Sequence, residues 1–187
     1  MKYYRLLDDV NIKGRWHLGE LTEHGGSSSI NLWHGVALNE RIGIQAEITD
    51  VGTPLEFCLS SFGVPIAKKR LALAIREAAG GDLQLLHVDI PGCLDFYALN
   101  CVRIVDCLDE GKSEFVKWTK ADHRSDLAGE YRMVTKLIVD PIRIPSHAHF
   151  FRIKGWTIAL IVSERIKTAM ELCGSFGAKF LNSTSQP

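Results

Sequence analysis

The sequence has no excess of charge of either sign and no long hydrophobic run. Its 22 Lys and Arg residues balance 22 Asp and Glu residues, so the formal net charge is zero at pH 7. A nucleic-acid binder usually has a basic excess, because neutralising phosphates supplies much of its affinity. No stretch reaches the roughly 18 apolar residues that a membrane-spanning helix needs. We therefore expect neither a nucleic-acid nor a membrane partner, although a balanced total can hide separate charged patches.

Cysteine is scarce and irregularly spaced. The five cysteines form no CxxC pair, and an odd, scattered set is a poor framework for disulfides. The N-terminus has no apolar run of signal-peptide length and no small-residue cleavage site. We therefore expect a cytoplasmic protein with reduced, mostly buried thiols. The cysteines are Cys58, Cys93, Cys101, Cys107 and Cys173.

Recognised catalytic and nucleotide-binding motifs are missing as well. The sequence contains no GxSxG, P-loop or GxGxxG pattern. His24-Gly25-Gly26 is similar to the glycine run of an oxyanion hole, but no nucleophile elbow accompanies it. The serines that follow it favour a flexible loop. We predict no catalytic residue, no cofactor and no enzymatic activity.

The sequence does have the composition of a folded domain. Hydrophobic residues make up 46% of it and charged residues 24%, which is typical of soluble globular proteins and argues against disorder. Alternating apolar residues predict many short strands, without regular alternation of strands and helices. We predict an α+β fold with mixed or antiparallel sheets and two principal helices. The expected strands are 3–7, 42–48, 56–59, 96–108, 113–119, 131–139, 150–153, 157–162 and 180–181.

Two segments have the apolar spacing of an amphipathic helix. The first begins near Pro65, because proline suits a first helical turn, and ends at Gly80-Gly81. The second begins after Ser163, a good N-cap residue, and ends at Gly174. Their apolar positions are Leu71, Ala74, Ile75 and Ala78 in the first and Ile166, Ala169, Met170 and Cys173 in the second.

Nothing in the sequence marks a repeat or an interdomain linker. We predict one domain over residues 1–181, with a subdivision near residue 80 as an open alternative, and a flexible polar tail over 182–187. The chain has four tryptophans, most of which we expect in the core, whereas an exposed one would indicate an interface. They are Trp16, Trp33, Trp118 and Trp156.

Two short runs suggest ligand binding and are better explained otherwise. His147-Ala148-His149 could present two metal ligands on one face of a strand. A zinc site needs three or four ligands, however, and no Cys or carboxylate follows at a recognised spacing, so we predict no metal site. Lys68-Lys69-Arg70 is basic, but adjacent residues spread around a helix, so we expect solvation, with nucleic-acid contact as the minor alternative.

Asp106-Cys107-Leu108-Asp109-Glu110 is a compact acidic run. A catalytic cysteine needs an electropositive setting that lowers its pKa, whereas three flanking carboxylates would raise the pKa of Cys107. We therefore interpret Cys107 as a thiol that is not a nucleophile. The run lacks the glycine and ligand spacing of a calcium loop, and short charge runs usually form solvated turns.

Five segments together resemble one family. They are MKYYRLLDD, RWHLGE, a Phe57-containing segment that leads to Pro65-Ile66, LNCVRIVDCLDEGKS, and FFRIKGWTIALIVSERIKTAMELCGSFGAKF. This combination, over nearly the whole chain, resembles the Imm11 immunity proteins of bacterial polymorphic toxin systems. The most specific parts are VDCLD and the Phe-Arg-Ile segment with the helix start Ile-Val-Ser-Glu. The resemblance implies a cytoplasmic antidote that binds a cognate toxin and blocks it stoichiometrically, with no catalytic residues.

The resemblance does not say which residues contact the toxin. If the toxin is a nuclease, its groove is basic, and an acidic patch would fit it and speed association. On that argument Asp106, Asp109 and Glu110 are the predicted contacts. Two alternatives stay open: an enzyme with an unrecognised site of His or Cys residues such as His87, and a plain scaffold or oligomerisation domain. The sequence does not indicate the oligomeric state.

Overall fold

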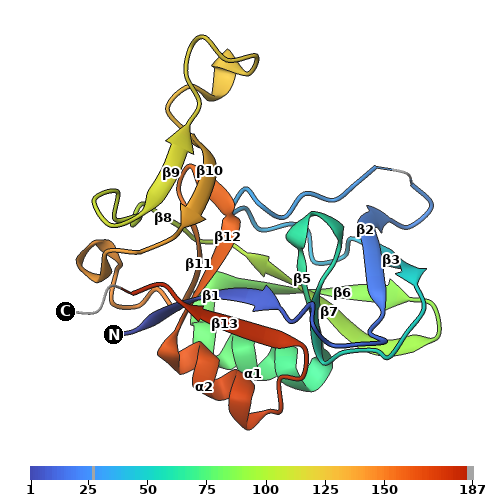
Figure 1. The fold of residues 1–187 in the computed structure, drawn as a ribbon. Helices are drawn as coiled ribbons and strands as arrows, with labels where there is room; N and C mark the ends of the chain where they lie inside the picture. Colours follow the sequence, from blue (N-terminus) through green and yellow to red (C-terminus); the bar gives the residue numbers. More distant parts are fainter. Residues whose placement is uncertain (27, 185–187) are drawn as a thin grey trace.

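The computed structural model describes residues 1–26 and 28–184, which form three β-sheets and two α-helices (Figure 1). The predicted α+β class with mixed and antiparallel sheets is confirmed. One sheet has five strands and contains both ends of the described chain. Its order is β13 (Ala178–Asn182), β1 (Tyr3–Asp8), β12 (Trp156–Ser163), β11 (Phe150–Ile153) and β8 (Ile104–Val105).

The second sheet has six strands and holds most of the N-terminal half. All its neighbours are antiparallel except β3 and β6, which pair in parallel. The order is β2 (His17–Glu23), β3 (Ile44–Asp50), β6 (Leu83–Ile90), β7 (Cys93–Cys101), β5 (Pro65–Lys68) and β4 (Phe57–Leu59). The predicted strand 96–108 is two strands, because the chain leaves this sheet after Cys101 and joins the five-stranded sheet at Ile104.

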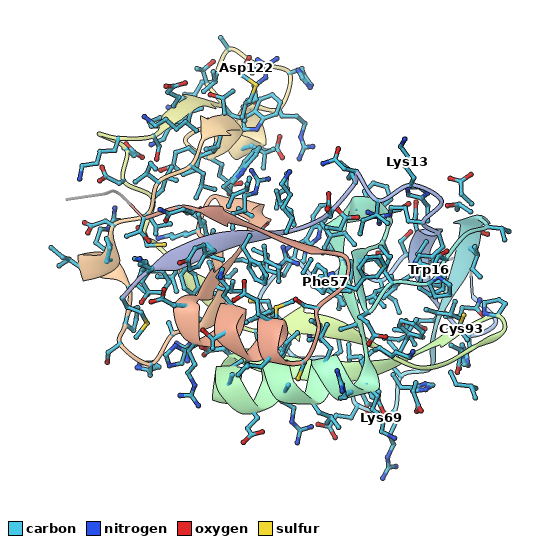
Figure 2. All side chains as sticks on the ribbon, turned by 60° about the horizontal axis from the view of Figure 1, so that its bottom comes forward. Lys13, Trp16, Phe57, Lys69, Cys93 and Asp122 are labelled. Carbon is cyan, nitrogen blue, oxygen red and sulfur yellow. The ribbon has the colours of Figure 1, made fainter. Side chains whose placement is uncertain are left out.

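A two-stranded arm projects from the rest of the molecule (Figure 1). It consists of β9 (Glu114–Lys117), β10 (Tyr131–Lys136) and the segment between them. The Phe115 and Tyr131 rings meet edge to face across it, with centroids 5.1 Å apart. Figure 2 shows Asp122 at its tip. The described residues include four short 3-10 helices, of which Ser125–Leu127 lies within the arm. The others are Ser61–Gly63, Gly80–Asp82 and Pro141–Arg143.

The two helices are α1 (Lys69–Ala79) and α2 (Glu164–Leu172). The start expected near Pro65 is wrong, because Ile66 and Ala67 instead pair with Ala98 and Tyr97 of β7 as part of β5. The predicted ends hold, since Gly80 takes a positive φ of 62° after α1 and Gly174 takes 72° after α2. Neither α-helix in the described ranges is long and apolar enough to cross a membrane.

One hydrophobic core joins the helices to both large sheets. Residues from either side of Gly80 contribute to it: Leu71 and Ile75 of α1 and Met170 of α2 pack with Phe57 of the six-stranded sheet and Phe150 of the five-stranded one. Figure 2 shows Phe57 in the interior. Each large sheet also has a separate core on its other face. Burial of these apolar faces supplies the main driving force for the fold.

Residues 182–184, which the prediction placed in the tail, are held in the fold. Asn182 still belongs to β13, and Ser183 is buried, with its backbone N–H donating to the Tyr3 carbonyl at 3.0 Å. The Thr184 hydroxyl accepts a hydrogen bond from the Tyr3 N–H at 2.7 Å. The backbone of Tyr3, at the start of β1, therefore supplies hydrogen-bond partners that hold Ser183 and Thr184 in place. Residues 185–187 of the predicted tail lie outside the described residues.

Candidate partner-binding surface

The acidic run predicted as the toxin contact leads from β8 into a turn at Glu110–Lys112, and its three carboxylates all face cations. We call residues Asp106–Glu110 the acidic turn. The Asp106 carboxylate lies 2.6 Å from Arg143 Nη2 and 4.0 Å from Lys154 Nζ. Glu110 Oε1 lies 2.6 Å from Lys117 Nζ. Local cations therefore offset the negative charge that the run shows in the sequence.

Asp109, the third carboxylate, has mainly a structural part in the acidic turn. Its Oδ1 accepts a hydrogen bond from the Gly111 N–H at 3.1 Å, and its Oδ2 lies 3.7 Å from Lys112 Nζ. Its backbone N–H donates to the Ile138 carbonyl at 2.9 Å. The turn thus connects β8 with the base of the arm.

Hydrogen bonds from Lys117 and Tyr131 lower the pKa of Glu110, so that carboxylate stays ionised in mild acid.

The buried thiols are poor nucleophiles. Burial is the main reason that the pKa of Cys107 rises to about 12, with a smaller contribution from Asp106. The predicted direction is confirmed, but the flanking carboxylates are not its principal cause. Burial also raises the pKa of Cys58 to about 12 and that of Cys101 to about 11. These thiols stay protonated at neutral pH, whereas the thiolate is the reactive form.

His147 and His149 lie in the loop before β11 and line one cavity of about 290 Å³ with Arg103 and Arg165. His149 Nδ1 lies 3.1 Å from the Ser163 hydroxyl, and its backbone N–H donates to Asp82 at 2.9 Å. Burial and the charge of Arg165 lower the pKa of His149. In residues 1–26 and 28–184, no group of three or more His, Cys, Asp or Glu side chains is placed to hold a metal ion.

The basic run at the start of α1 makes separate local contacts. Lys68 Nζ lies 3.4 Å from Glu56, Lys69 Nζ lies 3.6 Å from Asp95, and the Arg70 guanidinium donates to the Cys173 carbonyl at the end of α2. The three side chains therefore diverge, as their adjacent positions predict. They form no single patch, and each is used within the fold.

A groove opens where β3 and the β6–β7 hairpin separate. The parallel pairing of β3 with β6 covers only Ile44 with Val88 and Gln45 with Asp89. Beyond that point β3 continues to Asp50, while β6 turns back at Pro91-Gly92. The resulting groove has a volume of about 880 Å³. Its lining is Glu20, Thr22, Gln45, Ala46, Glu47, Asp89, Ile90, Pro91, Gly92, Cys93 and Leu94.

Among the described residues, three carboxylates line this groove, and no Lys or Arg lines it. A β-bulge brings two of them together: Leu18 pairs with Ile48 and Leu21 with Ala46, so Gly19 and Glu20 face the single residue Glu47. Bulges of this kind redirect side chains. In the described residues, no Lys or Arg ion-pairs with Glu20, Glu47 or Asp89. The neighbours of Asp89 are His24, with Nε2 at 2.7 Å, and His87, with Nδ1 at 3.5 Å.

His24 and His87 thus have a different setting from the one considered in the sequence. His24 follows β2, and its backbone N–H donates to the Gly43 carbonyl at 3.0 Å. The loop predicted after it, 24–29, includes Ser27, which lies outside the described residues. The His87 ring meets the Tyr97 ring edge to face, with centroids 5.5 Å apart. Both histidines lie beside the groove, and neither lines the cavity that contains His147.

A smaller apolar pocket of about 250 Å³ adjoins the groove and shares Glu20 with it. The Trp33 and Phe62 rings meet edge to face there, with centroids 6.2 Å apart. Phe62 is 63% exposed and has a left-handed backbone φ of 60°. That conformation costs a residue with a Cβ about 1–2 kcal/mol. The lining is Glu20, Ser29, Ile30, Asn31, Leu32, Trp33, Phe62 and Val64.

Most of the four tryptophans were expected in the core, but three of them are half-buried. Trp16 is buried at 1% exposure, whereas Trp33, Trp118 and Trp156 are half-buried. The Trp118 ring meets the His123 ring edge to face, and its centroid lies 5.0 Å from the Arg132 guanidinium within the arm. Of the half-buried tryptophans, Trp33 is the one that lines the apolar pocket.

The predicted contacts and the groove lie in different parts of the molecule. Figure 2 shows Cys93, which lines the groove, at the end opposite Asp122 at the tip of the arm. In Figure 1, β2 and β3 lie far from β9, whose last residue, Lys117, pairs with Glu110 of the acidic turn. No local pattern predicts the groove, because Glu20 lies on β2, Glu47 on β3 and Asp89 on β6.

Comparison with known proteins adds one finding about the family. Residues 87–184 match the family model described as Immunity protein family (Imm11). That range is more than half of the 187-residue chain. No curated protein matches the chain.

Proposed function

The chain belongs to the Imm11 immunity protein family, and we propose that it neutralises a cognate toxin by binding the toxic domain and occluding its working surface stoichiometrically. The family match over residues 87–184 is the observation that carries this proposal. The toxin acts inside the cell, so we place the antidote in the cytoplasm. The partner is a protein domain that the antidote holds without chemical change to either molecule.

Two features of the structure support binding as the mode of action. The groove and the apolar pocket adjoin one another and expose an aromatic pair, which is the kind of surface that protein partners use. The thiols with raised pKa values are suited to packing within the core rather than to nucleophilic attack. Stoichiometric occlusion needs such a surface and needs no reactive group.

A titration of toxin activity tests the proposal against a catalytic antidote. The toxic domain from the reading frame next to this chain's own is mixed with increasing amounts of the purified protein. We expect residual toxin activity to fall in proportion to the molar ratio and to reach its end at one to one. Full protection at a small fraction of one equivalent would show turnover and would contradict occlusion.

A growth experiment tests the role in cells. Co-expression with the toxic domain should restore growth, and the two proteins should co-purify. The His147→Ala variant serves as a matched control, because an antidote that used the His147 cavity would lose protection. A growth defect that the wild-type protein does not relieve would instead favour a scaffold or oligomerisation domain.

A further inference from the structure

We propose that the groove and the apolar pocket together form the toxin-docking surface, and that they take a basic segment of the toxin that carries a bulky apolar side chain. This inference rests on the proposed function and adds to it the location of the interface and the chemistry of the partner. We call the two cavities together the docking surface. The residues that carry the argument are Glu20, Glu47, Asp89, Trp33 and Phe62.

The charge of the groove selects the basic partner. Glu20 and Glu47 are brought together by the bulge in β2, and Asp89 lies across the groove at the end of the β3–β6 pairing. Among the described residues, no Lys or Arg side chain lines the groove, and the partners of these carboxylates are the Ser29 hydroxyl, which donates to Glu20, and His24 and His87 beside Asp89. The field of Glu20 and Glu47 is therefore available to an incoming cation, which speeds association and fixes orientation.

The apolar pocket selects the bulky side chain. Phe62 is 63% exposed, and Trp33 stands beside it with a ring that is only half-buried. Large aromatic residues in pockets carry much of the energy of protein interfaces. Ile30, Leu32 and Val64 complete an apolar lining that an aliphatic or aromatic side chain would fill.

Both aromatic residues are held in place before a partner arrives. Phe62 sits at the tip of the β4–β5 turn, which is closed by a hydrogen bond from the Ser60 N–H to the Val64 carbonyl at 2.9 Å. The loop after Trp33 is tied to the sheet, since the Asn100 amide donates to the Val36 carbonyl at 3.0 Å and Gln84 bonds to both backbone groups of Leu38. Preorganisation of this kind reduces the entropy lost on binding.

The two cavities act as one surface because they share a residue. Glu20 lines both, so a cation bound to its carboxylate lies next to the apolar pocket. A stable interface buries about 800 Å² on each partner. The toxin must therefore cover both cavities rather than insert one side chain, so the proposal requires a partner segment with basic and apolar groups side by side.

Matched charge-reversal variants test the proposal. Glu20→Lys with Glu47→Lys changes the groove, and Asp106→Lys with Glu110→Lys makes the same change of charge in the acidic turn. Binding of each to the toxic domain from the adjacent reading frame is measured by calorimetry. We expect at least a hundredfold loss of affinity for the groove variant and less than threefold for the turn variant. Thermal melting of both variants verifies that they fold.

If a charge reversal disturbs folding, neutral variants of the same residues still test the proposal. Glu20→Gln with Glu47→Gln preserves shape and should weaken binding about tenfold. A hundredfold loss in the turn variant, with wild-type affinity in both groove variants, would overturn this inference and leave the proposed function intact. Failure of the wild-type protein to bind at all would instead overturn the proposed function, and this inference with it.

A second copy of the chain is the other occupant to test. Light scattering gives the mass of the protein without toxin. We expect the wild-type protein and the Glu20→Lys with Glu47→Lys variant to have the same mass. A wild-type dimer that this variant converts to monomer would show that the docking surface binds another copy, and would overturn the assignment to the toxin.

Discussion

The acidic turn and the groove carry charge of the same sign and differ in what surrounds it. In the turn, Asp106 and Glu110 each lie 2.6 Å from a cationic nitrogen of Arg143 or Lys117. In the groove, Glu20 and Glu47 have no Lys or Arg partner among the described residues, and the fold alone brings them together. A charge run in a sequence therefore predicts a charged segment, but its neighbours in space decide whether that charge reaches a partner.

The difference follows from how each region is built. The turn's carboxylates are close in sequence, so their mutual repulsion is best relieved by cations that the fold places nearby, and exposed pairs of this kind add little stability. The groove's carboxylates tolerate one another because water screens them in an open cavity. We infer that the first arrangement supports the arm and that the second serves a partner. The predictions below test that division.

Placing a cation in the groove should abolish the difference between the two regions and give the largest effect of any single substitution. Gln45 is exposed beside Glu47 and its amide lies 3.3 Å from the Thr22 hydroxyl. Gln45→Lys would pair with the groove's carboxylates as Lys117 pairs with Glu110. We expect calorimetry to show about thirtyfold weaker toxin binding, with a smaller dependence on salt.

The control for that variant is Thr168→Lys, which makes the same change of charge on the exposed face of α2. It should bind the toxin with wild-type affinity. Equal losses in the two variants would mean that the total charge of the protein, rather than the groove, governs binding.

Removal of the Phe62 ring should weaken binding about tenfold without lowering stability. Glycine accepts the left-handed backbone that Phe62 adopts, so Phe62→Gly relieves strain while it empties one side of the apolar pocket. Calorimetry measures the affinity, and thermal melting should show a Tm no lower than that of the wild type. Phe176→Ala, at a phenylalanine that is 53% exposed and outside the pocket lining, is the control and should bind normally.

Thiol labelling should distinguish the two regions in the unmodified protein. Cys93 lines the groove and is partly exposed, whereas Cys107 in the acidic turn is buried with a pKa of about 12. We expect iodoacetamide at pH 8 to alkylate Cys93 and to leave Cys107 unmodified, as mass spectrometry of peptides would record. Saturating toxin should slow labelling of Cys93 at least fivefold. Unchanged labelling in the complex would place the toxin elsewhere.

The smallest effect on binding is expected from Glu110→Gln. The Glu110 carboxylate accepts hydrogen bonds from Lys117 at the end of β9 and Tyr131 at the start of β10, so its loss should change toxin affinity less than threefold. Burial is the main cause of the raised pKa of Tyr131, and the bond to Glu110 adds to it. The variant should therefore lower the pKa of Tyr131 but leave it above its ordinary value, as ultraviolet absorbance during an alkaline titration would show.

The sequence predicted the elements that depend on local patterns. Leu71 and Ile75 lie on the buried face of α1, and Ile166 and Met170 lie on that of α2, as their spacing indicated. Proline near a helical stripe gave the wrong start for α1, because Pro65 fits equally well as the first residue of β5. That choice depended on pairing with β7, which a local pattern does not contain.

The candidate site was harder to predict from the sequence than the helices and strands were. Asp106 and Glu110 stood out because they are adjacent, while their partners Arg143 and Lys117 come from other elements and were not foreseen. The bulge at Glu20 depends on the register of β2 against β3, and residue types alone do not determine that register. The sequence indicated that an exposed tryptophan would mark an interface, but it did not identify Trp33 as that residue.

Hydrogen–deuterium exchange of the antidote, free and bound to the toxic domain, tests the central claim most directly. It follows every backbone amide of the native protein, so it requires no substitution. We expect toxin to slow exchange in the segments that form the docking surface, residues 17–23, 29–33, 44–50, 60–64 and 89–94, and to leave the acidic turn unchanged. Slower exchange at Asp106–Glu110, with none in those five segments, would contradict the account.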